Sequence, residues 1–93
     1  MTGPIVQREA LYEGHVQGVG FRYTTRALAA GFTITGYVKN LPDGRVQVVV
    51  EGSEAEVDRF LAAVAGRLER YIRRVQMQTR AATCGFEQFE IAF

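Results

Sequence analysis

The sequence has little of several features that mark whole classes of protein. Its 93 residues include one cysteine, Cys84, which excludes an intramolecular disulfide and a zinc site built from several thiolates. We therefore expect a reducing, cytoplasmic setting. No apolar run approaches the roughly 20 residues of a membrane-spanning helix, so we expect no membrane association. The N-terminus also lacks the charged and apolar regions of a signal peptide.

The sequence also lacks an excess of either positive or negative charge. The formal net charge is +1, so no broad basic surface favours a nucleic-acid partner. Hydrophobic residues make up 47% of the chain, which is enough to build one core. At this length, roughly two-thirds of the unfolded surface is buried on folding. We expect residues 1–93 to form a single domain, and a monomer suits the small size and near-neutral charge.

Hydrophobic periodicity and turn residues predict seven elements besides one glycine-rich loop. A stripe at helical spacing marks the second helix, with Val57, Phe60 and Leu61 among its apolar residues. That helix should begin at Ser53, with Glu56 completing a reciprocal capping box. The firmest prediction is a β-hairpin, because L-P-D-G at 41–44 separates two β-branched segments. The expected elements are strand 5–13, helix 21–30, strand 34–40, strand 45–51, the helix from 53, strand 71–80 and strand 87–93.

This order predicts an α+β fold of the ferredoxin-like, split β-α-β type with one extra terminal strand. Both helices should cover one face of an antiparallel sheet, because each half of the chain places a helix between strands. The apolar sides of the helices and Val46, Val48 and Val50 should supply the core. The fold alone does not identify a function.

Residues 14–22, G-H-V-Q-G-V-G-F-R, contain three glycines and no acidic residue. Glycines permit positive φ, and such a loop feeding a helix N-terminus can bind an anion such as phosphate. Arg22 stands in the first helical turn, where the helix dipole disfavours a cation, and Arg26 adds a like charge one turn later. A bound phosphoryl group would offset both costs. From these residues alone, an ordinary strand-to-helix turn remains the alternative, and no G-K-S/T follows to make a nucleotide P-loop.

Asn40 is the second polar residue of interest, because it ends a strand immediately before the L-P-D-G turn. Asparagine is common beside turns, where its side chain bonds the local backbone. Whether Asn40 instead meets the glycine loop depends on the strand order, which periodicity does not give.

Two segments together resemble the signature motifs of the acylphosphatase family. These are V-Q-G-V-G-F-R at 16–22 and G-Y-V-K-N-L-P-D-G-R-V at 36–46. Their separation, the capped second helix and the aromatic last strand match as well, so the resemblance spans nearly the whole chain. The departures are His15, where the family usually has arginine or lysine, and Tyr37, where tryptophan is common.

The resemblance implies hydrolysis of an acyl phosphate to a carboxylate and inorganic phosphate, without a metal or cofactor. By this resemblance Asn40 holds the attacking water and Arg22 holds the phosphoryl group. The loop would add the backbone N–H groups of Gln17, Gly18, Val19, Gly20 and Phe21. The chemistry agrees, since phosphoryl transfer needs positioning and charge stabilisation, and an arginine fork fits phosphate oxygens bidentately.

Other functions stay open at this point. The same fold could serve as a non-catalytic module that binds phosphate or carbamoyl phosphate, which would bind without turnover. RNA binding on the sheet face is disfavoured, because the aromatics are not set in a basic, RNP-like motif.

Overall fold

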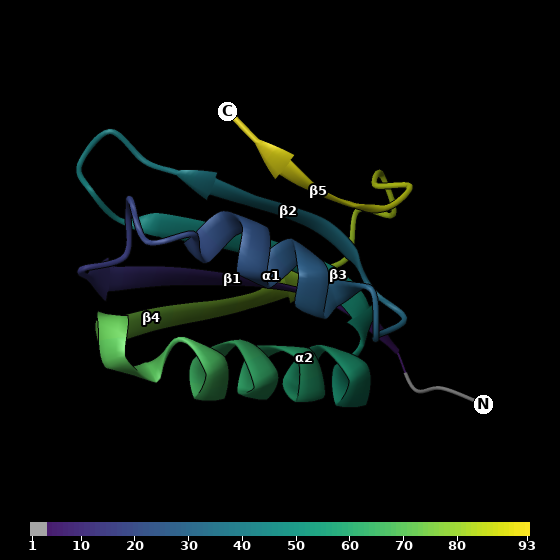
Figure 1. Ribbon diagram of the computed structural model, residues 1–93. Helices are drawn as coiled ribbons and strands as arrows, with labels where there is room; N and C mark the ends of the chain where they lie inside the picture. The colour runs from purple at the N-terminus through teal and green to yellow at the C-terminus, as the bar shows by residue number, and fades with distance from the viewer. Residues whose placement is uncertain (1–3) are drawn as a thin grey trace.

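The computed structural model describes residues 4–93, and its helices and strands follow the expected order (Figure 1). The bounds differ from the predicted ones by a few residues. The elements are β1 (Ile5–Gly14), α1 (Phe21–Ala29), β2 (Thr35–Asn40), β3 (Val46–Ser53), α2 (Glu54–Arg67), the 3-10 turn η1 (Glu69–Tyr71), β4 (Ile72–Ala81) and β5 (Phe89–Ala92).

The five strands form one sheet in the order β4-β1-β3-β2-β5, and both helices lie on the same face of it (Figure 1). Strands β1 and β3 lie side by side between β4 and β2, so the predicted split β-α-β arrangement is confirmed. One pairing departs from the expected antiparallel sheet. β5 runs parallel to β2, because the chain leaves β4 at one edge of the sheet and crosses to the other side, where β5 pairs with β2 and forms the opposite edge. No helix within residues 4–93 is long and apolar enough to span a membrane.

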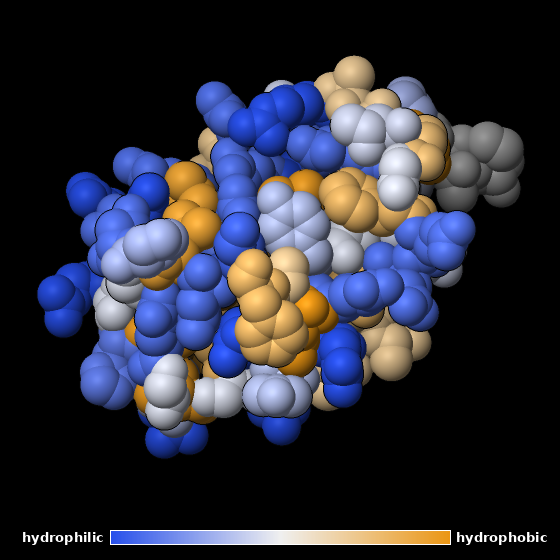
Figure 2. Space-filling view, turned by 90° about the horizontal axis from the view of Figure 1, so that it is seen from above, coloured by the Kyte–Doolittle hydropathy of each residue, from blue (hydrophilic) through white to orange (hydrophobic). Residues whose placement is uncertain are grey.

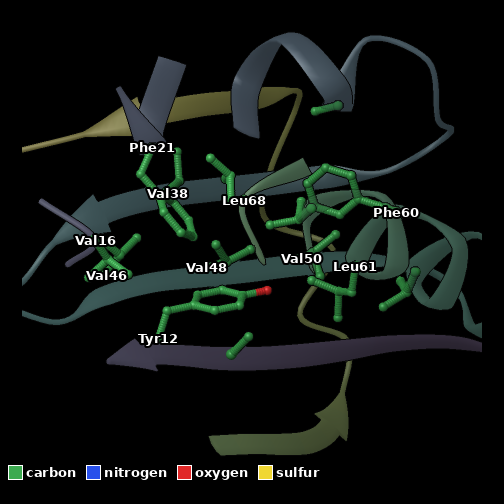
Figure 3. Close-up of a cluster of buried hydrophobic side chains, with 14 residues drawn as sticks. Tyr12, Val16, Phe21, Val38, Val46, Val48, Val50, Phe60, Leu61 and Leu68 are labelled. Atoms are coloured by element: carbon green, nitrogen blue, oxygen red, sulfur yellow. The ribbon is translucent and has the colours of Figure 1, made fainter. Parts of the chain in front are cut away.

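The core lies between the helices and the sheet, as predicted (Figure 3). Val46, Val48 and Val50 are fully buried, and the α2 stripe packs against them. Val75 and Met77 of β4 share the helix-side face with their β1 partners, yet they are 40% and 50% exposed. β4 is an edge strand, so the helices leave its apolar side chains partly uncovered.

The start of α2 confirms half of the predicted capping box. The Ser53 hydroxyl accepts the backbone N–H of Glu56 at 3.3 Å. The predicted return bond, from the Ser53 backbone N–H to the Glu56 side chain, is wrong. The Glu56 carboxylate instead accepts the backbone N–H of Thr33 at 2.7 Å and pairs with Arg59. Ser53 still belongs to β3 when α2 begins, so Glu56 reaches the α1–β2 connection instead. The Thr33 bond, then Arg59, holds the pKa of Glu56 below its ordinary value.

A buried carboxylate holds the segment that crosses from β4 to β5. Glu51 is 3% exposed, and its oxygens accept the backbone N–H groups of Thr83 at 2.8 Å and Cys84 at 2.9 Å. The Thr83 hydroxyl and the Gln7 amide donate to the same carboxylate at 2.9 and 2.8 Å. Burial alone raises the pKa of Glu51, but these bonds outweigh it and the pKa lies below the ordinary value.

Candidate active site

The glycine loop owes two of its glycines to backbone conformation. Gly18 and Gly20 have φ of 79° and 80°, in the left-handed region that side chains disfavour. A Cβ built on either residue meets no atom within 4 Å, so space is not the reason for glycine here. These two left-handed residues set the direction in which the loop presents its N–H groups.

The loop feeds directly into α1, and no side chain among the described residues 4–93 caps the N-terminus of that helix. Gly20 is the N-cap residue, and the first turn holds no acidic residue. Helix α2 differs, because Ser53 caps it and two acidic residues stand in its first turn. The first N–H groups of a helix need acceptors, and the dipole favours a negative charge there. The start of α1 is therefore suited to bind an anion from outside the protein.

Arg22 lies in this first turn and is partly exposed. Within residues 4–93 its guanidinium forms no ion pair. The guanidinium lies over the ring of Phe93, and Cζ of Arg22 is 5.2 Å from the ring centroid. The N–H groups of Arg22 therefore remain available to an anionic ligand, and arginine presents them as a planar fork.

Asn40 ends β2. Its side chain lies on the helix side of the sheet, the same side as the buried Val38 two residues earlier. Its Oδ1 is buried and accepts no hydrogen bond from any residue of the described part of the chain. The alternative interpretation, in which the side chain caps its own turn, therefore has no supporting bond at this oxygen. A buried acceptor of this kind is costly unless something donates to it. A water molecule in the site can fill that role.

Two links bring the loop and Asn40 to the same end of the molecule (Figure 1). The Gln17 side-chain amide donates to the backbone carbonyls of Leu41 at 2.9 Å and Arg45 at 3.0 Å. Those carbonyls belong to the turn that follows Asn40. The second link is β5, whose Ala92 pairs with Lys39, so that Phe93 comes beside the end of β2 while its ring contacts Arg22.

The predicted site residues therefore gather at one end of the sheet, and two contributors were not predicted. The Gln17 side chain fastens the loop to the turn, although the sequence indicated only its backbone N–H. Phe93 was placed in a strand with no role in the site. Strand alternation could not have indicated it, since its position depends on the parallel pairing of β5 with β2.

The turn next to the site carries one acidic residue, Asp43, which forms an ion pair with Arg45. Asp43 in the adjacent turn accepts the N–H of Arg45 at 3.0 Å and pairs with its side chain at 2.9 Å. The backbone bond is the main cause that holds the pKa of Asp43 below its usual value. Residues 4–93 contain no group of three or more His, Cys, Asp or Glu side chains that could hold one metal ion.

This arrangement has a defined chemical capability. The cationic fork of Arg22 and the open N–H groups of the loop can surround the oxygens of a small oxyanion. The neutral Oδ1 of Asn40 can accept a hydrogen bond from a water molecule without adding negative charge beside that anion. Such a site is suited to transfer of a phosphoryl group to water.

Comparison with known proteins gives a consistent result. The family model described as Acylphosphatase matches residues 8–91. An acylphosphatase of Archaeoglobus fulgidus is 44% identical over 90 residues, which cover 96% of this chain and 100% of that protein. The crystal structure of an acylphosphatase from Bacillus subtilis superposes with a TM-score of 0.84 at 30% identity, over 95% of this chain and 99% of that one.

A full-length HypF, solved in its phosphate- and nucleotide-bound form, also superposes with a TM-score of 0.81 at 25% identity. That match covers 96% of this chain but 12% of HypF, whereas the two acylphosphatases above are matched over 100% and 99% of their length. The family model, the full-length relative and the shared fold agree: the chain belongs to the acylphosphatase family.

Proposed function

We propose that this protein hydrolyses the carboxyl-phosphate bond of small acyl phosphates, with Arg22 and Asn40 as the catalytic residues. The observation that carries the proposal concerns residues 4–93, among which the buried Oδ1 of Asn40 has no hydrogen-bond partner and Arg22, at the end of the glycine loop, has no ion pair. Both features are costly in isolation, and a bound phosphoryl group with its attacking water would offset them.

In this proposal the phosphoryl group lies in the glycine loop. Arg22 donates two N–H groups to its oxygens, and the backbone N–H groups of residues 17–21 supply further donors. Asn40 accepts a hydrogen bond from the water, and this bond turns a lone pair of the water oxygen toward phosphorus. The P–O bond to the acyl group breaks as the water oxygen bonds to phosphorus, which yields a carboxylate, inorganic phosphate and a proton.

The leaving group explains how the site can work without a strong base or a metal. A carboxylate has a pKa of roughly 4, so it departs as a stable anion near neutral pH without being protonated. Ordinary phosphate esters release an alkoxide, which is far more basic, and should be poor substrates. The stability of the departing carboxylate is therefore the chemical reason to propose catalysis without a metal.

The finer assignments are proposals of the same kind. We take residues 1–93 as one acylphosphatase domain that acts as a monomer in the cytoplasm and without nucleic acid. The family match over residues 8–91 and the near-neutral charge support them. A non-catalytic module that binds phosphate or carbamoyl phosphate is the alternative, and turnover distinguishes the two.

The test is phosphate release from acetyl phosphate, measured with and without a chelator on the wild type and on Arg22→Ala. We expect turnover that the chelator leaves unchanged, and a loss of about 100-fold in Arg22→Ala, because one preorganised donor contributes about 3 kcal/mol. Arg26→Ala is the matched control, since it removes an exposed arginine one turn along the same helix. Phosphate binding without turnover would favour the non-catalytic module, and loss of activity with chelator would refute the metal-free mechanism.

A further inference from the structure

Phe93 is an exposed aromatic residue in contact with the candidate catalytic arginine. Its side chain is 89% exposed, and Cζ of Arg22 lies over its ring at 5.2 Å from the centroid. That separation is within the range at which an aromatic face attracts a cation. The molecule seen from the β5 side shows apolar residues at the surface among hydrophilic ones (Figure 2). The contact joins the last residue of the sequence to the start of α1.

The topology explains how Phe93 reaches this place. β5 pairs parallel to β2 with Lys39 opposite Ala92, so both strands run toward the same end of the sheet. Asn40 ends β2 there, and Phe93 follows Ala92. An antiparallel β5 would have carried the ring to the opposite end of the sheet, away from Arg22 at the start of α1. The parallel pairing therefore delivers the ring to the phosphoryl site.

An aromatic partner has a specific advantage for a phosphate-binding arginine. A carboxylate would occupy the N–H groups of Arg22 and place a negative charge beside an anionic substrate. A ring attracts the guanidinium through its face, so the N–H groups at the edge of the plane stay available. Arg22 is not among the arginine side chains that donate hydrogen bonds within residues 4–93. Those side chains are Arg8, Arg45, Arg59, Arg74 and Arg80.

We propose that Phe93 is a positioning residue that holds the Arg22 guanidinium in the orientation needed for the phosphoryl group. This inference rests on the proposed function and adds to it a residue that does not touch the reacting atoms. An oriented guanidinium loses less conformational freedom when the substrate binds, which favours binding of phosphate and of the transition state alike.

The experiment compares the wild type with Phe93→Leu, Phe93→Tyr and Phe93→Trp on acetyl phosphate, whose methyl group cannot stack on a ring. We expect Phe93→Leu to lower kcat/KM about two- to fivefold, the fold-change that a cation–π contact at an exposed site provides. Inhibition by inorganic phosphate should weaken by the same factor. Tyrosine and tryptophan should restore both values, because each keeps an aromatic face. Tyr23→Leu, which removes an exposed ring of α1, is the matched control and should change neither value.

A second arm separates positioning from a structural role. In the Arg22→Ala background, the Phe93→Leu change should have no further effect on phosphate affinity, measured by titration with inorganic phosphate. An equal loss in both backgrounds, or no rescue by the aromatic variants, would overturn the proposal. So would a loss seen with benzoyl phosphate but not with acetyl phosphate, which would make Phe93 a contact for the acyl group. Should the wild type bind phosphate without turnover, the proposed function fails while the titration still tests Phe93.

Discussion

The side-chain amide of Gln17 donates a hydrogen bond to the backbone carbonyl of Leu41 across 2.9 Å. Gln17 belongs to the glycine loop, and Leu41 directly follows Asn40, so this bond couples the glycine loop to the residue that holds the water in our proposal. The same amide also donates to the carbonyl of Arg45 at 3.0 Å. One side chain thus links the two halves of the candidate site.

We predict that Gln17→Ala lowers kcat/KM on acetyl phosphate by roughly tenfold or more, because small displacements of positioned groups are costly in catalysis. The stability should fall by about 1 kcal/mol, the usual value of a net hydrogen bond, as measured by urea denaturation. Gln47→Ala is the control, since its amide bonds Glu9 on the open face of the sheet. Equal kinetic losses in the two variants would show that the Gln17 link has no special role.

A second prediction concerns the buried carboxylate of Glu51 and pH. The folded pKa of Glu51 lies below its ordinary value of about 4.3, so the unfolded chain binds the proton more tightly. The charged group therefore contributes its full stabilisation above about pH 4.3 and loses it as the pH falls through the folded pKa. The wild-type free energy of unfolding should decrease in that acidic range.

Glu51→Gln should remove this dependence and lower stability at neutral pH by roughly 1–3 kcal/mol, because an amide cannot accept from all the donors around the carboxylate. Urea denaturation of both proteins at neutral and acidic pH measures the difference. Glu87→Gln, an exposed residue of the same connection, should behave as the wild type. If Glu51→Gln kept the full acid dependence of the wild type, other carboxylates would be responsible for it.

A third prediction concerns the Tyr12 hydroxyl, which lies in the core (Figure 3) and has no hydrogen-bond partner within residues 4–93. Burial raises the pKa of Tyr12 well above its usual value. Tyr12→Phe keeps the ring beside Phe21 and removes an unsatisfied polar group. We predict a stabilisation of roughly 1 kcal/mol, or a Tm increase of about 4–8 °C, measured by thermal denaturation. Destabilisation by Tyr12→Phe, against no change in Tyr23→Phe, would mean that the hydroxyl has a favourable partner.

Local signals in the sequence were enough to predict most of the fold. The L-P-D-G turn led correctly to the hairpin, because Gly44 takes a φ of 97° there. The spacing of Val57, Phe60 and Leu61 marked the buried face of α2. These features depend on neighbours in the chain, and so a sequence pattern reports them well.

What could not be predicted depends on contacts between distant segments. The direction of β5 follows from the path of the crossing chain, which strand alternation does not encode. Glu51 alternates with the core residue Val50 in β3, and no local pattern indicates that the crossing segment covers it through bonds from Thr83 and Cys84. Glu56 matched a capping box, yet in the folded chain its carboxylate accepts the backbone N–H of Thr33, a residue that is distant in the sequence. The two signature motifs indicated Arg22 and Asn40, whereas the contact of Phe93 with Arg22 needed the three-dimensional arrangement.

The central claim is a division of roles, in which Arg22 binds the phosphoryl group and Asn40 positions the water. Its most direct test measures kcat and the inhibition constant of inorganic phosphate side by side for the wild type, Arg22→Ala and Asn40→Ala. We predict that Arg22→Ala weakens phosphate inhibition and lowers kcat about 100-fold or more. Asn40→Ala should lower kcat strongly while phosphate inhibition stays close to that of the wild type. Weakening of phosphate inhibition in parallel with kcat in Asn40→Ala would contradict the account.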